Sequence, residues 1–362
     1  MSGVETTASE GGAQGPEGGL CKAGVVASTE TRESAPDARR RAGTPASALL
    51  VTASVGISLF AVLRLVVSGV FGHDGNRYTA AALALTPYVV LVAVGSAVIA
   101  AVLRRRGVLV LSAVLVVALA APLVPRVLAD AQPEAGGPLL RVAALNLYFG
   151  QADPGAVVEF VREREIDVLT LLELDESAHA ALEAAGLGDV LPHTVAYPAG
   201  AGVGSAIAAR YPLTELDLSG PSVFAQPSAR MSLPDGTAVE VVAVHALPPV
   251  TDATRWRSDL AALPAADPTG AVRVLAGDFN ATLDHAAFRD VLDAGYVDAA
   301  ESTGEALVTT WPRRRLGPPV TLDHVLVDEA AAVLDFAAVD VGASDHRAVV
   351  TTVRLPQRSA DA

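Results

Sequence analysis

Three apolar runs near the N-terminus restrict the possible folds of this chain more than any other feature. They cover about residues 46–70, 80–103 and 107–127, and the third is unbroken from Gly107 to Leu123. Each is close to the ~20 residues with which an α-helix crosses the hydrocarbon core of a bilayer. A cleaved signal peptide would explain only the first run. The sequence therefore predicts three transmembrane helices within residues 45–128.

The segments that flank these runs have a different composition. Residues 1–44 are rich in small and polar side chains and have few large apolar ones, which predicts a disordered cytoplasmic tail. Residues 129–139 carry Pro and Gly without periodicity, and we interpret them as a linker. The single cysteine, Cys21, lies in the tail and excludes an intramolecular disulfide.

The positions of the arginines predict the orientation of the helices. Arg39–Arg41 precede the first run and Arg104–Arg106 separate the second from the third, whereas the loop after the first run carries only Arg77. Because basic loops stay on the cytoplasmic side, we expect a multi-pass plasma-membrane protein whose C-terminal domain is extracellular. Arg64, within the first run, is expected to extend to the membrane interface, with contact to an anionic lipid headgroup as the alternative.

Residues 140–356 show short apolar strands that alternate with helical stretches, which predicts an α/β domain before a short tail at 357–362. The closely spaced later strands favour mixed sheets. Helices are expected from Pro154 after the cap Asp153, around Glu176, and near the caps Asp252 and Asp284. Strands are expected at 141–147, 168–172, 205–209, 238–244, 272–275, 321–327 and 348–353.

Polar side chains recur where these strands end. In Gly277-Asp278-Phe279-Asn280 the acid and the amide stand two residues apart, so on an extended backbone both can face one ligand. A carboxylate can take a proton from water or bind a metal, and an amide can hydrogen-bond a phosphoryl oxygen. Any one such residue is typical of a cap or a sheet edge, but their repetition predicts a single phosphate-processing site. The other strand ends carry Asn146, Glu173, His245, Asp323, Asp345 and His346.

The order of these motifs, above all Gly-Asp-x-Asn and Ser-Asp-His, resembles the endonuclease/exonuclease/phosphatase superfamily over about residues 140–355. The resemblance implies a four-layered α/β sandwich, in which two mixed β-sheets lie between helices and the site lies at one end. It also implies that Glu173 is the principal ligand of Mg²⁺, with Mn²⁺ as the alternative ion, and that Asn146 and Asp345 assist it.

The same resemblance implies roles for the remaining side chains. Asp278 would orient or deprotonate the attacking water, and Asn280 would hold a phosphoryl oxygen. His346 and His245 would donate to the phosphate, and Asp323 would fix the tautomer of His346.

Some residues depart from the family pattern or match no part of it. Leu172 and Leu145 stand where the family often has polar or aromatic residues, which affects support for the metal ligands. His324, after the orienting aspartate, is expected either to support the site or to pack in the core. Three further histidines are expected at the surface, namely His179, His193 and His285.

Charge disfavours nucleic acid as the substrate. From Leu140 to the C-terminus the chain has 15 arginines, no lysine and 31 acidic residues, a balance that repels a polyanion. One basic run, Arg313–Arg315, lies close to Trp311. Arg314 in this run could clamp a diphosphate.

The architecture favours a lipid substrate instead. Three spans and an outward-facing domain would place the site beside phosphorylated or pyrophosphorylated lipids. The run His245-Ala246-Leu247-Pro248-Pro249 also resembles the actinobacterial teicoplanin-resistance membrane proteins, which implies hydrolysis of a polyprenyl pyrophosphate carrier and a role in glycopeptide resistance. The alternatives are a membrane-tethered extracellular nuclease or phosphodiesterase, and a non-enzymatic binding module on the same fold.

Overall fold

The apolar N-terminal runs form helices, but not three simple ones. In the computed structural model, which describes residues 45–313 and 316–357, the second run is broken into two helices. The helical elements are α1 (Pro45–Ala61), which continues as the π-helical η1 (Val62–Ser68), then α2 (Arg77–Leu83), α3 (Thr86–Val102) and α4 (Arg106–Ala120), followed by the 3₁₀ turns η2 (Ala121–Leu123) and η3 (Pro125–Val127). The expected tail with Cys21 and Arg39–Arg41 lies outside the described residues, as do Arg314 and residues 358–362.

The break in the second run has a local cause. Pro87 lies in the first turn of α3, where its ring lacks an N–H and would clash with the carbonyl of Leu83 in a continuous helix. Thr86 Oγ1 instead donates to Leu83 O at 2.7 Å. The two helices are bent by 66°. The helix expected over residues 80–103 is therefore a bent pair of helices, of which α3 covers Thr86–Val102.

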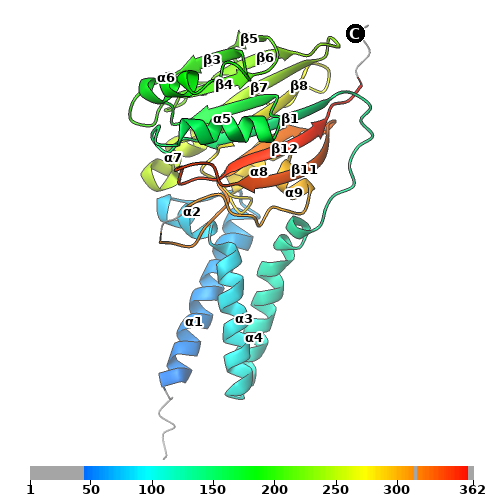
Figure 1. Cartoon of the computed structure of the whole chain (residues 1–362). Helices are drawn as coiled ribbons and strands as arrows, with labels where there is room; N and C mark the ends of the chain where they lie inside the picture. The colour runs from blue at the N-terminus through cyan, green and yellow to red at the C-terminus, as the bar shows by residue number, and fades with distance from the viewer. Residues whose placement is uncertain (1–44, 314–315, 358–362) are drawn as a thin grey trace, which may run out of the picture. The chain divides into compact units, whose positions relative to one another are not determined.

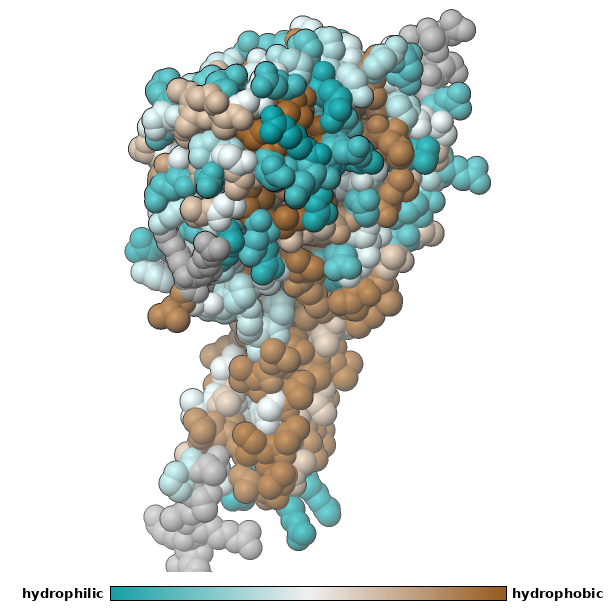
Figure 2. Space-filling model, in the orientation of Figure 1, coloured by the Kyte–Doolittle hydropathy of each residue, from teal (hydrophilic) through white to brown (hydrophobic). Residues whose placement is uncertain are grey.

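The helices have the length and surface of membrane spans. Within the described part of the chain, Ser47–Ser68 and Arg106–Leu123 are long and apolar enough to cross a bilayer, and α2 with α3 passes the same test if the bent pair counts as one span. Apolar side chains are exposed along them, and Figure 2 shows apolar surface over this part of the molecule. Examples are Leu59 on α1, Leu91 on α3 and Val117 on α4.

Among the described residues, the strands form two six-stranded sheets. In spatial order, the first sheet comprises β11 (Ala332–Val339), β12 (Ala348–Arg354), β1 (Leu139–Asn146), β2 (Val168–Leu172), β4 (Ser205–Ala209) and β3 (His193–Tyr197). The second comprises β5 (Leu213–Leu216), β6 (Ser228–Ser232), β7 (Ala238–His245), β8 (Val272–Asp278), β10 (Asp323–Asp328) and β9 (Tyr296–Asp298). β1 and β2 are parallel, as are β7 and β8, whereas the other neighbours are antiparallel, so both sheets are mixed as expected.

The sheets pack face to face and helices cover their outer faces (Figure 1). Val142, Val241 and Val274 belong to the core between the sheets. On the outer face of the first sheet lie α5 (Pro154–Glu163) and α6 (Glu176–Ala184), and on that of the second lie α7 (Pro249–Ala261), α8 (Ala286–Leu292) and the short α9 (Ala299–Ser302). This order of layers is the α/β sandwich that the sequence predicts.

Two of the predicted helix caps are confirmed. Asp153 Oδ1 accepts from the backbone N–H groups of Gly155 and Ala156 at the start of α5. Asp252 lies at a kink within α7, and its carboxylate accepts from the N–H groups of Thr254 and Arg255, so it caps the part of the helix after the kink.

Candidate active site

One edge of the sandwich collects the polar side chains that follow the strands. The parallel pairs β1/β2 and β7/β8 all end at this edge, and the antiparallel strands β10 and β12 begin there. Register shows the convergence directly, because Asp278 pairs with His245 on one side and with Asp323 on the other. The topology therefore brings the polar strand ends into one place, as the sequence predicts.

Asn146 links two carboxylates at this edge. It is fully buried, and its Nδ2 donates to Glu173 Oε1 at 3.0 Å and to Asp278 Oδ2 at 3.1 Å. Its Oδ1 accepts from the Tyr148 N–H at 2.9 Å. Glu173 Oε2 accepts from the Phe149 N–H at 2.6 Å. In this arrangement Asn146 positions the carboxylates with its amide nitrogen, and its predicted role as a metal ligand stays a prediction.

Backbone geometry turns two of these side chains out of their strands. Glu173 has φ +56° and Asn280 has φ +47°, a region that non-glycine residues rarely adopt and that is enriched at functional sites. Gly277 has φ +154°, and a Cβ there would collide with the Val244 carbonyl of the adjacent strand. Position 277 therefore requires glycine, so that Asp278 can follow at the strand end.

Asp278, Asp323 and His346 form a buried acid–imidazole group. His346 Nδ1 lies 2.9 Å from Asp323 Oδ2, and His346 Nε2 lies 3.9 Å from Asp278 Oδ2. The expected contact of Asp323 with one ring nitrogen of His346 is thus confirmed. Burial lowers the pKa of His346, but Asp323 and the other nearby carboxylates outweigh it and raise that pKa to about 9. His346 is therefore protonated at neutral pH.

The pKa of Asp278 moves in the direction that a general base requires. Burial and then the negative charge of Asp323 raise it to about 7. Asp278 Oδ1 accepts from the Asn280 N–H at 2.9 Å, and Asn280 Nδ2 donates to Ala246 O at 3.0 Å. A carboxylate with a pKa near neutrality can both accept and release a proton at physiological pH.

His245 is held as a neutral ring. Burial, and then the charge of His346, lower its pKa to about 3. The ring stacks on Phe224, with centroids 4.3 Å apart, and its Nδ1 has no hydrogen-bond partner among the described residues. A neutral imidazole with an unused nitrogen at the site can bind a ligand oxygen.

Asp345 joins the site through the segment before β12. It lines the same cleft as Glu173 and His346, and Trp311 Nε1 donates to its Oδ2 at 3.4 Å. Ser344, the serine of the Ser-Asp-His motif, was assigned no role from the sequence; its Oγ donates to Asn146 O at 2.6 Å.

The basic run near Trp311 does not present its first arginine to the site. Arg313 pairs with Asp340 through Nε at 3.1 Å, and its Nη1 donates to Gly342 O at 2.8 Å. Arg314 is not among the described residues, so its predicted contact with a diphosphate stays a prediction.

The donor set fits a divalent metal ion. Asp278, Asp323 and His346 each place a ligand atom within 4.8 Å of the others, so this group could hold a metal ion. Glu173 and Asp345 line the same cleft and offer further carboxylate oxygens. Burial raises the pKa of Glu173, so a bound cation would favour its charged form. Oxygen ligands and excess negative charge suit Mg²⁺ or Mn²⁺.

The site opens into a cleft of about 550 Å³. Glu173, Asp278, Asn280, His245 and His346 all line it. Its other walls come from residues that sequence reasoning did not connect with the site, including Phe149, Phe224, Trp311 and Ala80, Ala81, Ala84 and Leu85 of the helical segment. No single motif marks these residues, because they are apolar and come from distant parts of the chain.

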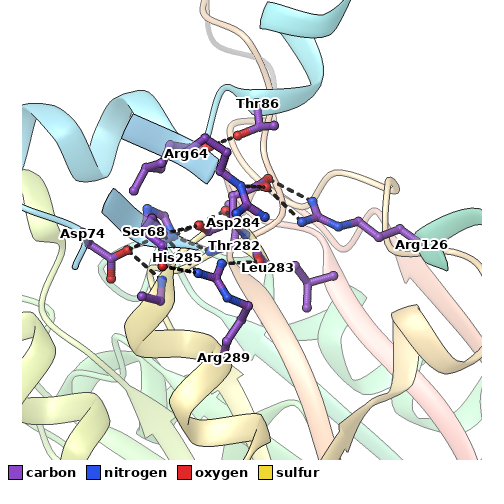
Figure 3. A network of polar contacts seen from close by, with 12 residues as sticks. Arg64, Ser68, Asp74, Thr86, Arg126, Thr282, Leu283, Asp284, His285 and Arg289 are labelled. Carbon is purple, nitrogen blue, oxygen red and sulfur yellow. Dashed lines mark hydrogen bonds and ion pairs between the residues drawn. The ribbon is translucent and has the colours of Figure 1, made fainter. Parts of the chain in front are cut away.

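A second polar cluster, here called the latch, consists of Arg64, Arg126 and Asp284 (Figure 3). Arg64 Nε lies 2.7 Å from Asp284 Oδ1, and Arg126 binds the same carboxylate with two nitrogens, each at 2.9 Å. All three side chains are buried. Burial raises the pKa of Asp284, but the two arginines outweigh it and hold that pKa below its usual range. The expectation that Arg64 extends to the membrane interface is therefore wrong.

Further contacts beside the latch show that the predictions for Asp284 as a helix cap and for His285 at the surface are wrong. Asp74, from the segment before α2, accepts from the N–H groups of Ala286 and Ala287 at 2.7 and 2.9 Å, so it caps α8 in place of Asp284 (Figure 3). His285, expected at the surface, is buried. Its Nδ1 accepts from the Thr282 N–H, which leaves Nε2 to donate to Ala80 O at 2.8 Å.

The remaining histidines divide as follows. His324 is buried, with Nδ1 2.6 Å from Asp298 Oδ2 and Nε2 3.1 Å from Ala281 O, and it packs on Phe279 and Phe288. It therefore belongs to the core, which was one of its two expected positions. Partial exposure agrees with the surface prediction for His179 and His193.

Comparison with known proteins identifies the globular part of the chain. The model of a family described as "Endonuclease/Exonuclease/phosphatase family" matches residues 143–346, which is more than half of the chain. No curated protein matches.

Several solved structures are similar to the chain. A humanized TDP2 of D. rerio is 17% identical, with 59% of this chain and 98% of that chain covered and a TM-score of 0.48. The endonuclease/exonuclease/phosphatase from Beutenbergia cavernae is 20% identical, with 60% and 72% covered and a TM-score of 0.45. A family protein from Bacteroides thetaiotaomicron is 15% identical, with 61% and 100% covered and a TM-score of 0.43.

Proposed function

Because the chain belongs to the Endonuclease/Exonuclease/phosphatase family and is an enzyme of the phosphodiesterase, phosphatase or nuclease class, we propose that it hydrolyses a phosphoester or pyrophosphate of a membrane lipid. It would be anchored by its N-terminal helices, face the outside of the cell and use Mg²⁺, with Mn²⁺ as the alternative. A polyprenyl pyrophosphate carrier fits this description, and its hydrolysis would give the chain a role in glycopeptide antibiotic resistance.

The observation that carries the proposal is the attachment of the apolar helices at the catalytic edge. Asp284, which binds Arg64 and Arg126 from the helical segment, lies four positions after Asn280. Ala80 and Ala84 also line the cleft that contains Asp278. If the helices enter a bilayer, a substrate that is itself held in the bilayer lies nearest to this site.

The arginines of the helical segment support the outward orientation. Arg104, Arg105 and Arg106 are exposed between α3 and α4, where a cytoplasmic loop is expected by the positive-inside rule. The sandwich follows η3, after α4 has returned to the other side. Protease added to intact cells should then cleave the C-terminal domain, and protection there would reverse the orientation.

The residues of the chain supply the steps of an in-line hydrolysis. Asp278 can take the proton of the attacking water, and Asn146 and the Asn280 N–H hold its carboxylate in place. His346, kept protonated by Asp323, can donate to the phosphate, and neutral His245 can offer an N–H to a second oxygen. A metal ion held by Glu173 and Asp345 would neutralise charge that develops on the phosphoryl group.

The alternative function is a membrane-tethered nuclease or phosphodiesterase. The family permits it. The acidic balance from Leu140 onward and the absence of lysine there disfavour binding of a polyanion. DNA retained by the full chain only at low salt would support a nuclease.

The test is substrate hydrolysis by the purified full chain in detergent with Mg²⁺, and again with chelator, measured as phosphate release from a pyrophosphate and as cleavage products from a phosphodiester. The full chain is needed because removal of residues 1–138 would leave Asp284 buried without its arginines. The substrates are a polyprenyl pyrophosphate, a phosphodiester lipid and DNA. Turnover of the pyrophosphate that chelator abolishes supports the proposal, whereas turnover of DNA alone supports the alternative.

Two variants test the assignment of the site. Glu173→Gln removes a proposed metal ligand and Asp278→Asn removes the proposed base, so each should lower turnover by about 10²-fold or more. Glu163→Gln changes an exposed glutamate at the end of α5 and is the matched control. Wild-type turnover in both site variants would show that the site is elsewhere.

A further inference from the structure

The cleft that contains the catalytic side chains has an apolar part that catalysis does not explain. One wall is formed by Ala80, Ala81, Ala84 and Leu85, at and just after the end of α2. These side chains cannot take part in proton transfer or metal binding. Small residues at this position keep the cleft open, since a larger side chain on the same backbone would fill it.

Other apolar residues from the sandwich line the same cleft. Pro248, Pro249 and Val250 come from the start of α7, and Pro318 and Val320 come from the segment before β10. Val250 is 55% exposed, so part of this surface is open to solvent. Exposed apolar surface that continues into a cleft is typical of a binding site for an apolar ligand.

Specific contacts hold the α2 wall against the sandwich. His285 Nε2 donates to Ala80 O. Asp74, which precedes α2 in the sequence, caps helix α8 of the sandwich. Arg257 Nη1 donates to Gly75 O at 2.7 Å, and Tyr88 OH donates to Pro319 O at 2.7 Å. The wall is therefore fixed on both sides of the cleft.

The wall also leads directly into an apolar helix. Leu85 separates α2 from α3, and α3 presents exposed Leu91, Val94 and Val98 along its length. An apolar chain that left the cleft past Leu85 would meet this surface. The cleft thus joins a phosphate-processing site at one end to a lipid-compatible helix at the other.

We propose that the part of the cleft lined by Ala80, Ala81, Ala84, Leu85 and Pro318, here called the chain arm, binds the isoprenoid chain of the substrate next to its phosphorylated end. This inference rests on the proposed function and assigns the chain-binding region of the same site. Binding of a bare soluble phosphate needs no such arm. The size of the side chains on α2 then determines which chains the enzyme accepts.

The first experiment changes the width of the arm. Ala81→Phe and Ala84→Phe are compared with Ala82→Phe, since Ala82 is half-buried like Ala81 and Ala84 but does not line the cleft. Hydrolysis of a long-chain polyprenyl pyrophosphate, geranyl pyrophosphate and inorganic pyrophosphate is measured with the full chain in detergent. The two arm variants should lose at least about tenfold more kcat/KM on the long-chain substrate than on inorganic pyrophosphate, whereas Ala82→Phe should lose equally little on all three. Equal losses on all substrates in the arm variants would overturn the chain arm.

The second experiment does not depend on turnover or on the variants. A long-chain isoprenoid phosphonate with a diazirine near its phosphonate end is photolysed with the wild-type full chain, and labelled peptides are identified. Label on residues 80–85 or 318–322 supports the chain arm, and label confined to the exposed faces of α1 and α4 overturns it. Label in the arm without any turnover of polyprenyl pyrophosphate would overturn the proposed function and leave the chain arm standing. Turnover of polyprenyl pyrophosphate with label only outside residues 80–85 and 318–322 would overturn the chain arm and leave the proposed function standing.

Discussion

Asp278 and Asp284 are two buried aspartates, six positions apart, at the same end of the sandwich. Burial and the neighbouring Asp323 raise the pKa of Asp278 to about 7. At Asp284 burial acts in the same direction, but Arg126 and Arg64 outweigh it and keep the pKa below its usual range. Burial alone therefore does not decide the state of a carboxylate. The neighbouring charges decide it, because Asp323 raises the pKa of Asp278 further whereas the two arginines lower that of Asp284.

The comparison predicts that the largest loss of activity comes from Asp278. Asp278→Asn should lower kcat by about 10³-fold because it removes the base. It should leave the free energy of unfolding unchanged or slightly higher, because it also removes the repulsion between Asp278 and Asp323. Phosphate release and urea unfolding, measured on the same preparation, check both parts. If Asp278→Asn lost as much unfolding free energy as Asp284→Asn, the two aspartates would not differ in their contribution to stability.

Replacement of Asp284 should mainly lower stability. Asp284→Asn leaves two buried arginines without a carboxylate, so the free energy of unfolding should fall by about 3–5 kcal/mol. Asp293→Asn, at an exposed aspartate nine positions later, should change it by less than about 0.5 kcal/mol. Equal stability of the two variants in urea unfolding would show that the latch contributes little.

Replacement of the whole latch sharpens this prediction. If Arg64, Arg126 and Asp284 are changed together to Met, Met and Leu, none of the three buried charges of the latch remains. Most of the stability lost in Asp284→Asn should then return, since buried ion pairs can often be replaced by apolar groups of similar volume. A triple variant as unstable as the single one would mean that the cost lies in packing and not in charge.

Asp74 should have a smaller effect. Asp74→Ala removes the carboxylate that caps α8 and should cost about 1 kcal/mol of unfolding free energy. Asp74→Asn keeps an acceptor oxygen and should recover most of that amount. Identical stability of the two variants would argue against a capping role.

The smallest effect is expected on acidification. The pKa of Asp284 is lower in the folded chain than in the unfolded chain, so its contribution is complete above the unfolded value of about 3.9 and is lost as pH falls through the folded value. The difference in stability between wild type and Asp284→Asn should stay constant from pH 7 to about pH 5 and shrink only below about pH 4. A difference that already falls between pH 7 and pH 5 would contradict the lowered pKa.

Sequence reasoning predicted that the polar strand ends meet at one edge of the sandwich, because local patterns determine it. Apolar strands that end in Asn146, Glu173, His245 and Asp278 predict both the strands and the direction in which the polar side chains leave them. Two mixed sheets then place those ends together. The contact of Asp323 with His346, which the family resemblance implies, is confirmed.

The same reasoning failed where a residue's partner lies far away in the sequence. Arg64 lies in an apolar run, which predicts a position at the membrane interface. Asp284 precedes a helical pattern, which predicts that it caps that helix. Periodicity gives the face that a residue occupies but not the group opposite it, and these two residues are 220 positions apart. His285 looked like a surface residue for the same reason, because Ala80 O, its partner, belongs to another segment.

The latch also restricts how this chain can diverge. Its three charges come from positions 64, 126 and 284. Loss of Asp284 leaves two buried arginines without a carboxylate, and loss of either arginine removes ion-pair partners from the buried Asp284. A substitution at one of these positions alone should therefore destabilise the fold and be removed by selection. Replacement of all three by apolar residues together should be tolerated. Related chains should show these positions changing as a set, and a catalytic domain recombined with foreign helices should persist only where the set has been exchanged with it.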